Sequence, residues 1–226
     1  MNCKLRLIGT VVVLALIQPI HALSAPTLIE LTADANRPAV NDLVRSTVFA
    51  EATGSTANEL SKQVSKLIAD ALRTAKSYPG IKVQSSGTST YPNYSKSGKI
   101  DSWRMRSDLL LESSDTAAMS DLLGKLQSTL GVSSLVLLPS PETRKTAENE
   151  AILDAITAFK VRAKVIADAL GQRYHIKQLS VNSSSQLNQP VFRAAAKSMA
   201  LDSAPMPMEA GDTQVNVNIS GQIELE

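Results

Sequence analysis

The stretch EAILDAITAFKVRAKVIADALG, residues 150–171, constrains the fold more than any other part of this chain. Apolar and small residues recur in it every three or four positions, which is the spacing of an α-helix. Pro141 precedes the pattern, at a position where proline suits a helix start, and Gly171 follows it. The sequence therefore predicts one long, alanine-rich helix over residues 142–170. Its small side chains would let a sheet or another helix approach the backbone closely.

This helix carries two apolar rows, separated by charged residues that keep part of its surface hydrated. The first row comprises Ala151, Ile152, Ala155, Ile156, Phe159, Ala163, Ile166, Ala167 and Leu170. The second row comprises Leu153, Ala158, Val161, Val165 and Ala169. Packing in a core is the simpler explanation of such a helix, and self-association of two copies is the alternative.

The rest of the chain predicts strands and two shorter helices. Alternating apolar and polar residues predict strands at residues 27–35, 43–52, 81–91, 100–112, 132–138, 174–184 and 213–225. One helix is expected to end near Lys76, and another to run from Asp115 to Gly131. The apolar run VSSLVLL, residues 132–138, is typical of a strand at the centre of a sheet. The order, approximately ββαββαβαββ, predicts an α+β fold of mixed or antiparallel sheets with packed helices.

The first 25 residues have the composition of a secretory signal peptide. A basic start precedes a short apolar run, and small residues follow it. We therefore expect export, cleavage between Ala22 and Ala25, and a periplasmic or secreted domain over residues 26–226. The apolar run is too short to span a membrane comfortably, so no stable membrane span is expected after cleavage.

Cleavage would change the charge and the chemistry of the chain. Of its 23 Lys and Arg residues two lie in the first 25 positions, whereas none of its 21 Asp and Glu residues does. The processed chain would be formally neutral, which provides no field to attract nucleic acid. Its single cysteine, Cys3, would also be removed. Without it no disulfide can form and no thiol nucleophile exists.

The sequence contains no motif of an enzyme or cofactor site. His175 is the one histidine outside the signal peptide, so a multi-histidine or Cys/His metal site is excluded. No phosphate-binding loop, dinucleotide-binding fingerprint or nucleophile motif occurs, and the carboxylates are scattered. We therefore expect no catalytic, cofactor-binding or metal-binding residues, no cofactor and no enzymatic activity.

Two segments are candidate contact surfaces. Tyr91 and Tyr94 lie in a predicted hairpin with Trp103 nearby, and an aromatic platform of this kind can bind a glycan, a peptide or a base. Packing of the hairpin tip, or a contact between subunits, is the alternative. Residues 187–211 break the regular pattern, as a long assembly element or functional loop does. The candidate contact residues there are Phe192, Met199, Met206 and Met208.

Two segments of the chain resemble the SIMPL-domain family of bacterial periplasmic and secreted proteins. They are VQSSGTSTYPNYSKSGKIDSWRMRSDLLLES, residues 83–113, and AENEAILDAITAFKVRAKVIADALG, residues 147–171, which a strand follows directly. The resemblance covers roughly residues 28–225. The chain departs from the family in a first strand without glycine and in Ser102-Trp103, where the family often has Gly-Tyr.

The resemblance implies a non-enzymatic envelope protein with no catalytic residues to carry over. Some relatives assemble into ring- or channel-like homo-oligomers, and some are linked to oxidative-stress tolerance. The leading hypothesis is therefore a periplasmic protein that acts by self-assembly into a homo-oligomer or by binding an envelope protein partner.

Two other functions remain open at the level of sequence. One is a monomeric envelope protein that binds a small ligand or glycan, or hydrolyses it, at the aromatic hairpin near Trp103. A concave pocket where Tyr91, Tyr94 or Trp103 meets a carboxylate would favour it. The other is a stress chaperone that uses exposed apolar surface around the methionines of residues 187–211.

Overall fold

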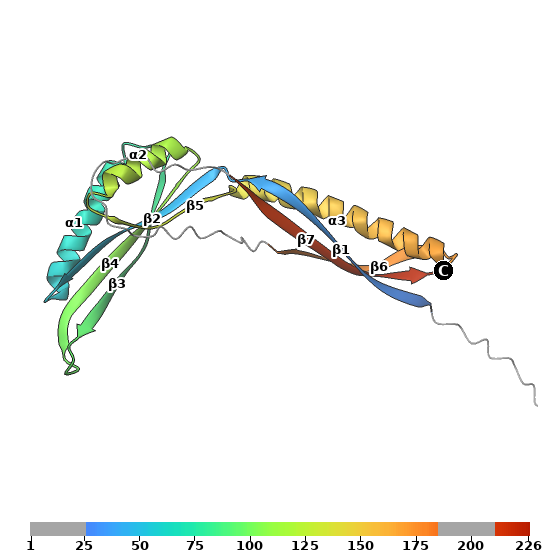
Figure 1. Ribbon diagram of the computed structural model, residues 1–226, viewed down its shortest axis with the longest axis horizontal. Coiled ribbons are helices and arrows are strands. Elements are labelled where there is room, and N and C mark those ends of the chain that lie inside the picture. The colour runs from blue at the N-terminus through green and yellow to red at the C-terminus, as the bar shows by residue number, and fades with distance from the viewer. Residues whose placement is uncertain (1–25, 185–210) are drawn as a thin grey trace, which may run out of the picture.

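Two antiparallel sheets, one covered on one face by two helices and the other by a single helix, make up the protein in a computed structural model that describes residues 26–184 and 211–226 (Figure 1). The elements are β1 (Thr27–Val40), β2 (Leu43–Gly54), α1 (Ala57–Ala75), β3 (Lys82–Tyr94), β4 (Ile100–Ser113), α2 (Thr116–Leu126), β5 (Gly131–Leu138), α3 (Pro141–Ala169), β6 (Tyr174–Ser184) and β7 (Asp212–Leu225). This confirms the predicted α+β fold and the approximate order of its elements. The expected signal peptide, and the excursion at 187–211 apart from Gly211, lie outside the described residues.

The first sheet has the strand order β3-β4-β2-β5, and α1 and α2 pack on one of its faces. Buried residues alternate with less buried ones along β2 and β4, as the sequence predicts for strands with one covered face. The core between sheet and helices includes Val44, Val48, Leu60, Val64, Leu109, Leu111, Met119, Leu122 and Leu123. Both helices begin at a side-chain cap, because Thr56 accepts a hydrogen bond from the backbone N–H of Glu59 and Asp115 accepts one from that of Ala118.

Two sequence predictions about this sheet were wrong. The apolar strand expected at its centre is β5, which lies at an edge and pairs with β2 alone. Its apolar side chains contact the core from the edge, with Val132 and Leu135 only partly buried. The second helix was expected to continue to Gly131, but α2 ends at Leu126.

Gly131 is instead the first residue of β5. The ring of Phe49 occupies the space where a side chain at position 131 would lie. A Cβ atom at position 131 would lie 2.4 Å from Cζ of Phe49, which is closer than carbon atoms can approach. Glycine is therefore required here by a close approach, whereas the sequence suggested a helix end.

The second sheet has the strand order β1-β7-β6, so the last strand of the chain lies between the first strand and β6. β1 continues to Val40, beyond the predicted end at residue 35, and includes Pro38. Proline is tolerated because β1 is an edge strand, where a backbone N–H can be missing without breaking a ladder on both sides. The α3 helix packs across one face of this sheet, mainly on β1 and β7.

A row of small side chains brings α3 close to this sheet. The buried residues of α3 recur every four positions and are Ala147, Ala151, Ala155, Phe159, Ala163 and Ala167. The last five contact a core that includes Ala33 of β1 and Val217, Ile219 and Ile223 of β7, and Ala147 packs separately with Ala39 and Val215. The alanine-rich sequence thus serves to pack the helix on a sheet, as predicted for Ala151, Ala155, Phe159, Ala163 and Ala167 of its first apolar row. Leu170, which was expected in the same row, is 56% exposed.

Phe159 is the one large residue in that buried row, and it lies over a glycine. A Cβ atom at Gly221 would lie 3.1 Å from Cζ of Phe159 and 2.4 Å from the backbone oxygen of Gln178. The residue at position 221 must therefore lack a side chain for β6, β7 and α3 to meet as they do.

We expect Gly221→Ala to lower the free energy of unfolding by about 1–3 kcal/mol, the usual cost of overpacking a core. The matched control is Gly124→Ala in α2, where no heavy atom lies within 4 Å of the added Cβ. Alanine there should leave stability unchanged or raise it, because alanine favours helix over glycine. Urea denaturation followed by circular dichroism measures both, and equal stability of the two variants would contradict the packing described here.

The two halves of the molecule meet where β1 passes into β2 and β5 passes into α3 (Figure 1). Asp42, between β1 and β2, accepts hydrogen bonds from the backbone N–H and the hydroxyl of Ser140 and from the hydroxyl of Thr143. Ser140 is itself the N-cap of α3. Partial loss of hydration acts to raise the pKa of the exposed Asp42, but the bonds from Thr143 and Ser140 outweigh it, so its pKa lies below the ordinary value of 3.8.

We expect Asp42→Asn to destabilise the protein by about 1 kcal/mol at neutral pH, because an exposed carboxylate that accepts several hydrogen bonds loses its charge. A lowered pKa stabilises the fold above the unfolded-state pKa, and this contribution is lost as pH falls through the folded-state pKa. The stability gap between wild type and variant should therefore be constant above about pH 5 and close below about pH 4.

Urea denaturation at a series of pH values measures this gap. Asp34→Asn, at an exposed position of β1, is the control and should show no gap. A stability gap that persists unchanged to about pH 2 would mean that the charge of Asp42 does not stabilise the place where the β1–β2 and β5–α3 connections meet.

Candidate functional site

The three aromatic residues singled out in the sequence do not gather on one platform. Tyr91 and Tyr94 are 56% and 65% exposed, as expected for contact residues. Trp103 is partly buried and packs against the core under α1 and α2. Tyr91 pairs with Arg104 across the β3–β4 ladder, one position from the pair of Pro92 with Trp103. Since successive residues of a strand point to opposite faces, Tyr91 and Trp103 lie on opposite sides of the sheet.

The face of the four-stranded sheet that α1 and α2 leave uncovered carries a pattern of charged and aromatic side chains. We call it the open face, and define it by Arg45, Phe49, Glu51, Tyr91, Arg104, Arg106, Asp108 and Glu112. These residues occupy positions on β2, β3 and β4 that alternate with the buried ones. The open face is therefore a side of the sheet that presents polar groups to its surroundings.

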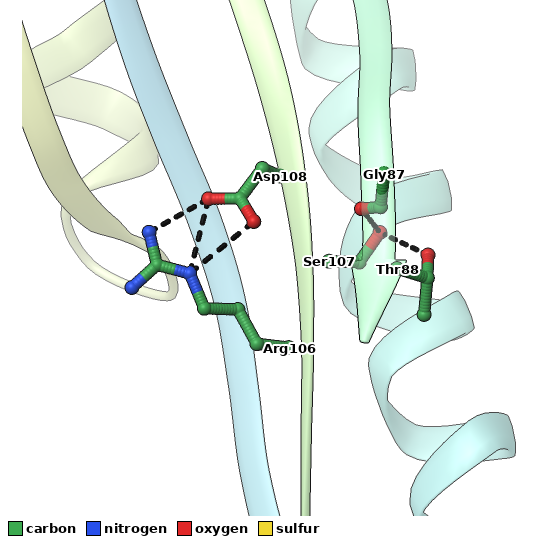
Figure 2. Close-up of polar contacts among 5 residues, drawn as sticks. All are labelled: Gly87, Thr88, Arg106, Ser107 and Asp108. Atoms are coloured by element: carbon green, nitrogen blue, oxygen red, sulfur yellow. Dashed lines mark hydrogen bonds and ion pairs between the residues drawn. The ribbon is translucent and has the colours of Figure 1, made fainter. Parts of the chain in front are cut away.

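Arg106 lies at the centre of the open face. Its Nε and Nη2 atoms donate hydrogen bonds of 3.0 and 2.7 Å to Oδ1 of Asp108, as Figure 2 shows. Its guanidinium also lies over the ring of Phe49, with 3.8 Å between Cζ and the ring centroid. The hydrogen bonds that Arg106 donates to Asp108 raise the pKa of Arg106, against a smaller opposite effect of burial. The close contact of Phe49 with Gly131 fixes the ring beneath this cation.

Further ion pairs cross between the strands of the open face. Nε of Arg45 in β2 lies 2.6 Å from Oε1 of Glu112 in β4, and Nε of Arg104 lies 3.8 Å from Oε1 of Glu51. Each basic side chain thus has an acidic neighbour within the same face. Surface pairs of this kind contribute little to stability, but they fix where each charge is presented.

On the opposite side of β4, a bulge in β3 provides hydrogen-bond partners for the buried hydroxyl of Ser107. Ser107, next to Arg106 in sequence, points the other way and bonds to the hydroxyl of Thr88 at 2.9 Å, as Figure 2 shows. Its hydroxyl also lies 3.4 Å from the carbonyl oxygen of Gly87. The register shifts at Gly87, whose φ of +149° is a conformation that favours glycine. The bulge lets a buried hydroxyl find partners while the other face keeps its charged pattern.

The remaining sequence predictions concern metals, histidine and the excursion. His175 lies exposed in β6, with Nδ1 3.3 Å from Glu226 and Nε2 3.5 Å from Glu224. Within residues 26–184 and 211–226, no three His, Cys, Asp or Glu side chains are placed to hold a metal ion. The candidate contact residues Phe192, Met199, Met206 and Met208 lie outside the part of the chain that the structure describes.

Sequence reasoning did not single out Phe49, Arg106 and Asp108. A signal for part of the site exists in the segment WRMRSD, where Arg104, Arg106 and Asp108 alternate and must share one face of a strand. The contact of Arg106 with Phe49 depends instead on the pairing of β2 with β4, which alternation within one strand does not specify.

No helix in the described ranges is long and apolar enough to cross a membrane.

We expect Asp108→Asn to lower the free energy of unfolding by about 0.5–1 kcal/mol, because Arg106 loses a charged partner in a partly buried pair. Asp101→Asn, at an exposed position of the same strand, should change it by less than half as much. Urea denaturation measures both variants. Equal effects of the two substitutions would show that the pair of Arg106 with Asp108 has no special part in holding the open face.

Comparison with known families adds one match. A family model described as SIMPL, protein of unknown function (DUF541), matches residues 29–223. A search of curated proteins gives no match.

Proposed function

We propose that this chain, which belongs to the SIMPL family, is a non-enzymatic protein of the cell envelope that acts by self-assembly or partner binding. The signal peptide expected at residues 1–25 would export it to the periplasm. Stress tolerance, which the resemblance to the family suggests, is the physiological setting that we propose for it. The open face of the four-stranded sheet is its contact surface for a protein partner.

The observation that carries this proposal is the exposure of Tyr91 beside the cations of the open face. Tyr91 is 56% exposed and lies opposite Arg104 in the β3–β4 ladder. Tyrosine and arginine are enriched where proteins bind one another, because both combine large apolar area with directed hydrogen bonds. The ion pairs and the contact of Phe49 with Arg106 hold this surface in one arrangement before any partner arrives, which lowers the entropic cost of binding.

The alternative is a monomeric binder or hydrolase that uses the aromatic hairpin near Trp103 to hold a small ligand or glycan. The exposed tyrosines favour it, since sugars stack on aromatic faces. The position of Trp103 weighs against it, because Trp103 packs toward the helices while Tyr91 lies on the opposite side of the sheet. The alternative would therefore have to work with Tyr91 and Tyr94 alone.

Photo-crosslinking in bacteria that export the protein tests the proposal. A benzophenone amino acid at position 91 should give a discrete adduct heavier than the single chain. The same amino acid at position 62, exposed on α1, should give none. Adducts of equal yield at both positions, or at neither, would show that the open face is not a binding surface.

Fluorescence tests the alternative, because Trp103 is the only tryptophan in the chain. Titration of the purified protein with a chitin oligosaccharide is expected to leave its emission unchanged. A saturable change that Tyr91→Ser abolishes would support a glycan-binding protein in place of the proposed partner-binding protein.

A further inference from the structure

The two halves of the molecule meet at one small junction. The four-stranded half comprises β2, β3, β4 and β5 with α1 and α2, and the three-stranded half comprises β1, β6 and β7 with α3. Each apolar cluster of the described residues lies within one half. The ion pairs of the described ranges also stay within one half. The angle between the halves is therefore not fixed by a shared core, as Figure 1 illustrates.

The connection from β1 to β2 crosses this junction through a single residue. The backbone N–H of Asn41 donates to the carbonyl oxygen of Gly211, and its side chain accepts a hydrogen bond from Thr213. Asn41 is thus held by the three-stranded half. The next strand begins at Leu43, in the four-stranded sheet. Asp42 alone lies between the two halves on this connection.

The connection from β5 to α3 crosses beside it, also through one residue. Leu138 ends β5 and pairs with Leu43, whereas Ser140 is already the N-cap of α3. Pro139 lies between them and is buried, and its ring fixes one of its two backbone dihedral angles. Two crossings of one residue each allow the halves to rotate about the line that joins the crossings, and they resist rotation about other axes.

Asp42 ties the two connections together. Its carboxylate accepts hydrogen bonds from the backbone N–H of Ser140 at 2.5 Å, from the Ser140 hydroxyl at 3.1 Å and from the hydroxyl of Thr143. Both donor residues belong to the start of α3, whereas Asp42 leads directly into β2. Within residues 26–184 and 211–226, these are the side-chain hydrogen bonds that join the two halves.

A junction of this kind suits a hinge. Parts of a chain that meet without a large apolar interface are expected to move relative to one another. Hinge residues are a few positions at the ends of elements that absorb the change in backbone dihedral angles. Asp42 and Pro139 occupy such positions, and the contacts that oppose a rotation there converge on one exposed carboxylate.

We propose that the carboxylate of Asp42 fixes the angle between the four-stranded and three-stranded halves, and that the halves pivot about Asp42 and Pro139 when its hydrogen bonds are lost. Such a pivot changes the direction in which the open face points relative to α3 without unfolding either sheet. The device needs neither a partner nor a second copy of the chain, so it stands apart from the proposed function.

Pulsed electron paramagnetic resonance between two spin labels tests the pivot. Lys62→Cys in α1 and Thr157→Cys in α3 place labels at exposed positions of the two halves, in a Cys3→Ser background that removes the only other thiol. Position 157 lies about 24 Å along α3 from its start, so a rotation of about 20° moves this label by about 8 Å. An excess of unlabelled chain ensures that the distances arise within one molecule.

Asp42→Asn should broaden the 62–157 distance distribution by about twofold or more, because the amide lacks the charge and replaces an acceptor oxygen with a donor. The control pair is Leu28→Cys with Lys145→Cys, which lies wholly within the three-stranded half and should keep its width. An unchanged 62–157 distribution would overturn the proposal. Equal broadening of both pairs would also overturn it, because the substitution would then loosen the sheet itself.

Thr143→Val tests the same contact from the side of α3, and it decides the question if Asp42→Asn does not fold. Valine keeps the branched shape of threonine but cannot donate to Asp42, so the 62–157 distribution should broaden, by less than with Asp42→Asn. Thr146→Val is the matched control, since the hydroxyl of Thr146 donates to the carbonyl oxygen of Glu142 in the same helix. Equal widths for the two valine variants would contradict the proposal.

Discussion

The close approach of α3 to β7 is the contact on which the second half of the fold depends. The last strand lies between β1 and β6, so the first and last strands of the described chain pair with each other. Among the described residues, α3 is the helix that covers this sheet, and its alanine row lets it pack on β1 and β7 with Phe159 over Gly221. Burial of this row of small residues holds α3 against β1 and β7, the first and last strands of the described chain.

Much of the fold could be predicted because apolar and polar residues recur along the sequence at the spacing of strands and helices. Alternation identified the strands, and the four-residue recurrence of alanine identified α3 and its buried side. The failures concern contacts between distant residues. No pattern in the sequence indicates that β5 lies at an edge of its sheet. None indicates that Gly131 lies against Phe49 of β2, so its position suggested a helix end. The contact of Phe49 with Arg106 at the centre of the open face also joins residues that are distant in sequence, because the pairing of β2 with β4 brings them together.

The molecule presents two surfaces of different character. The open face is polar and held by pairs such as Arg106 with Asp108, so it suits a partner recognised through directed contacts. The outer side of α3 exposes the aliphatic side chains of Leu153, Val161 and Val165. The open face belongs to the four-stranded sheet, whereas α3 packs on the three-stranded sheet, so the two surfaces are separate.

Self-assembly is the part of the proposed function that the absolute mass of the purified exported chain can decide. Light scattering after size exclusion, over a range of concentrations, gives that mass without reference to shape. We expect a defined species at least twice the mass of one chain, with dissociation on dilution. A single-chain mass at every concentration would contradict the claim and direct attention to a ligand at Tyr91 and Tyr94.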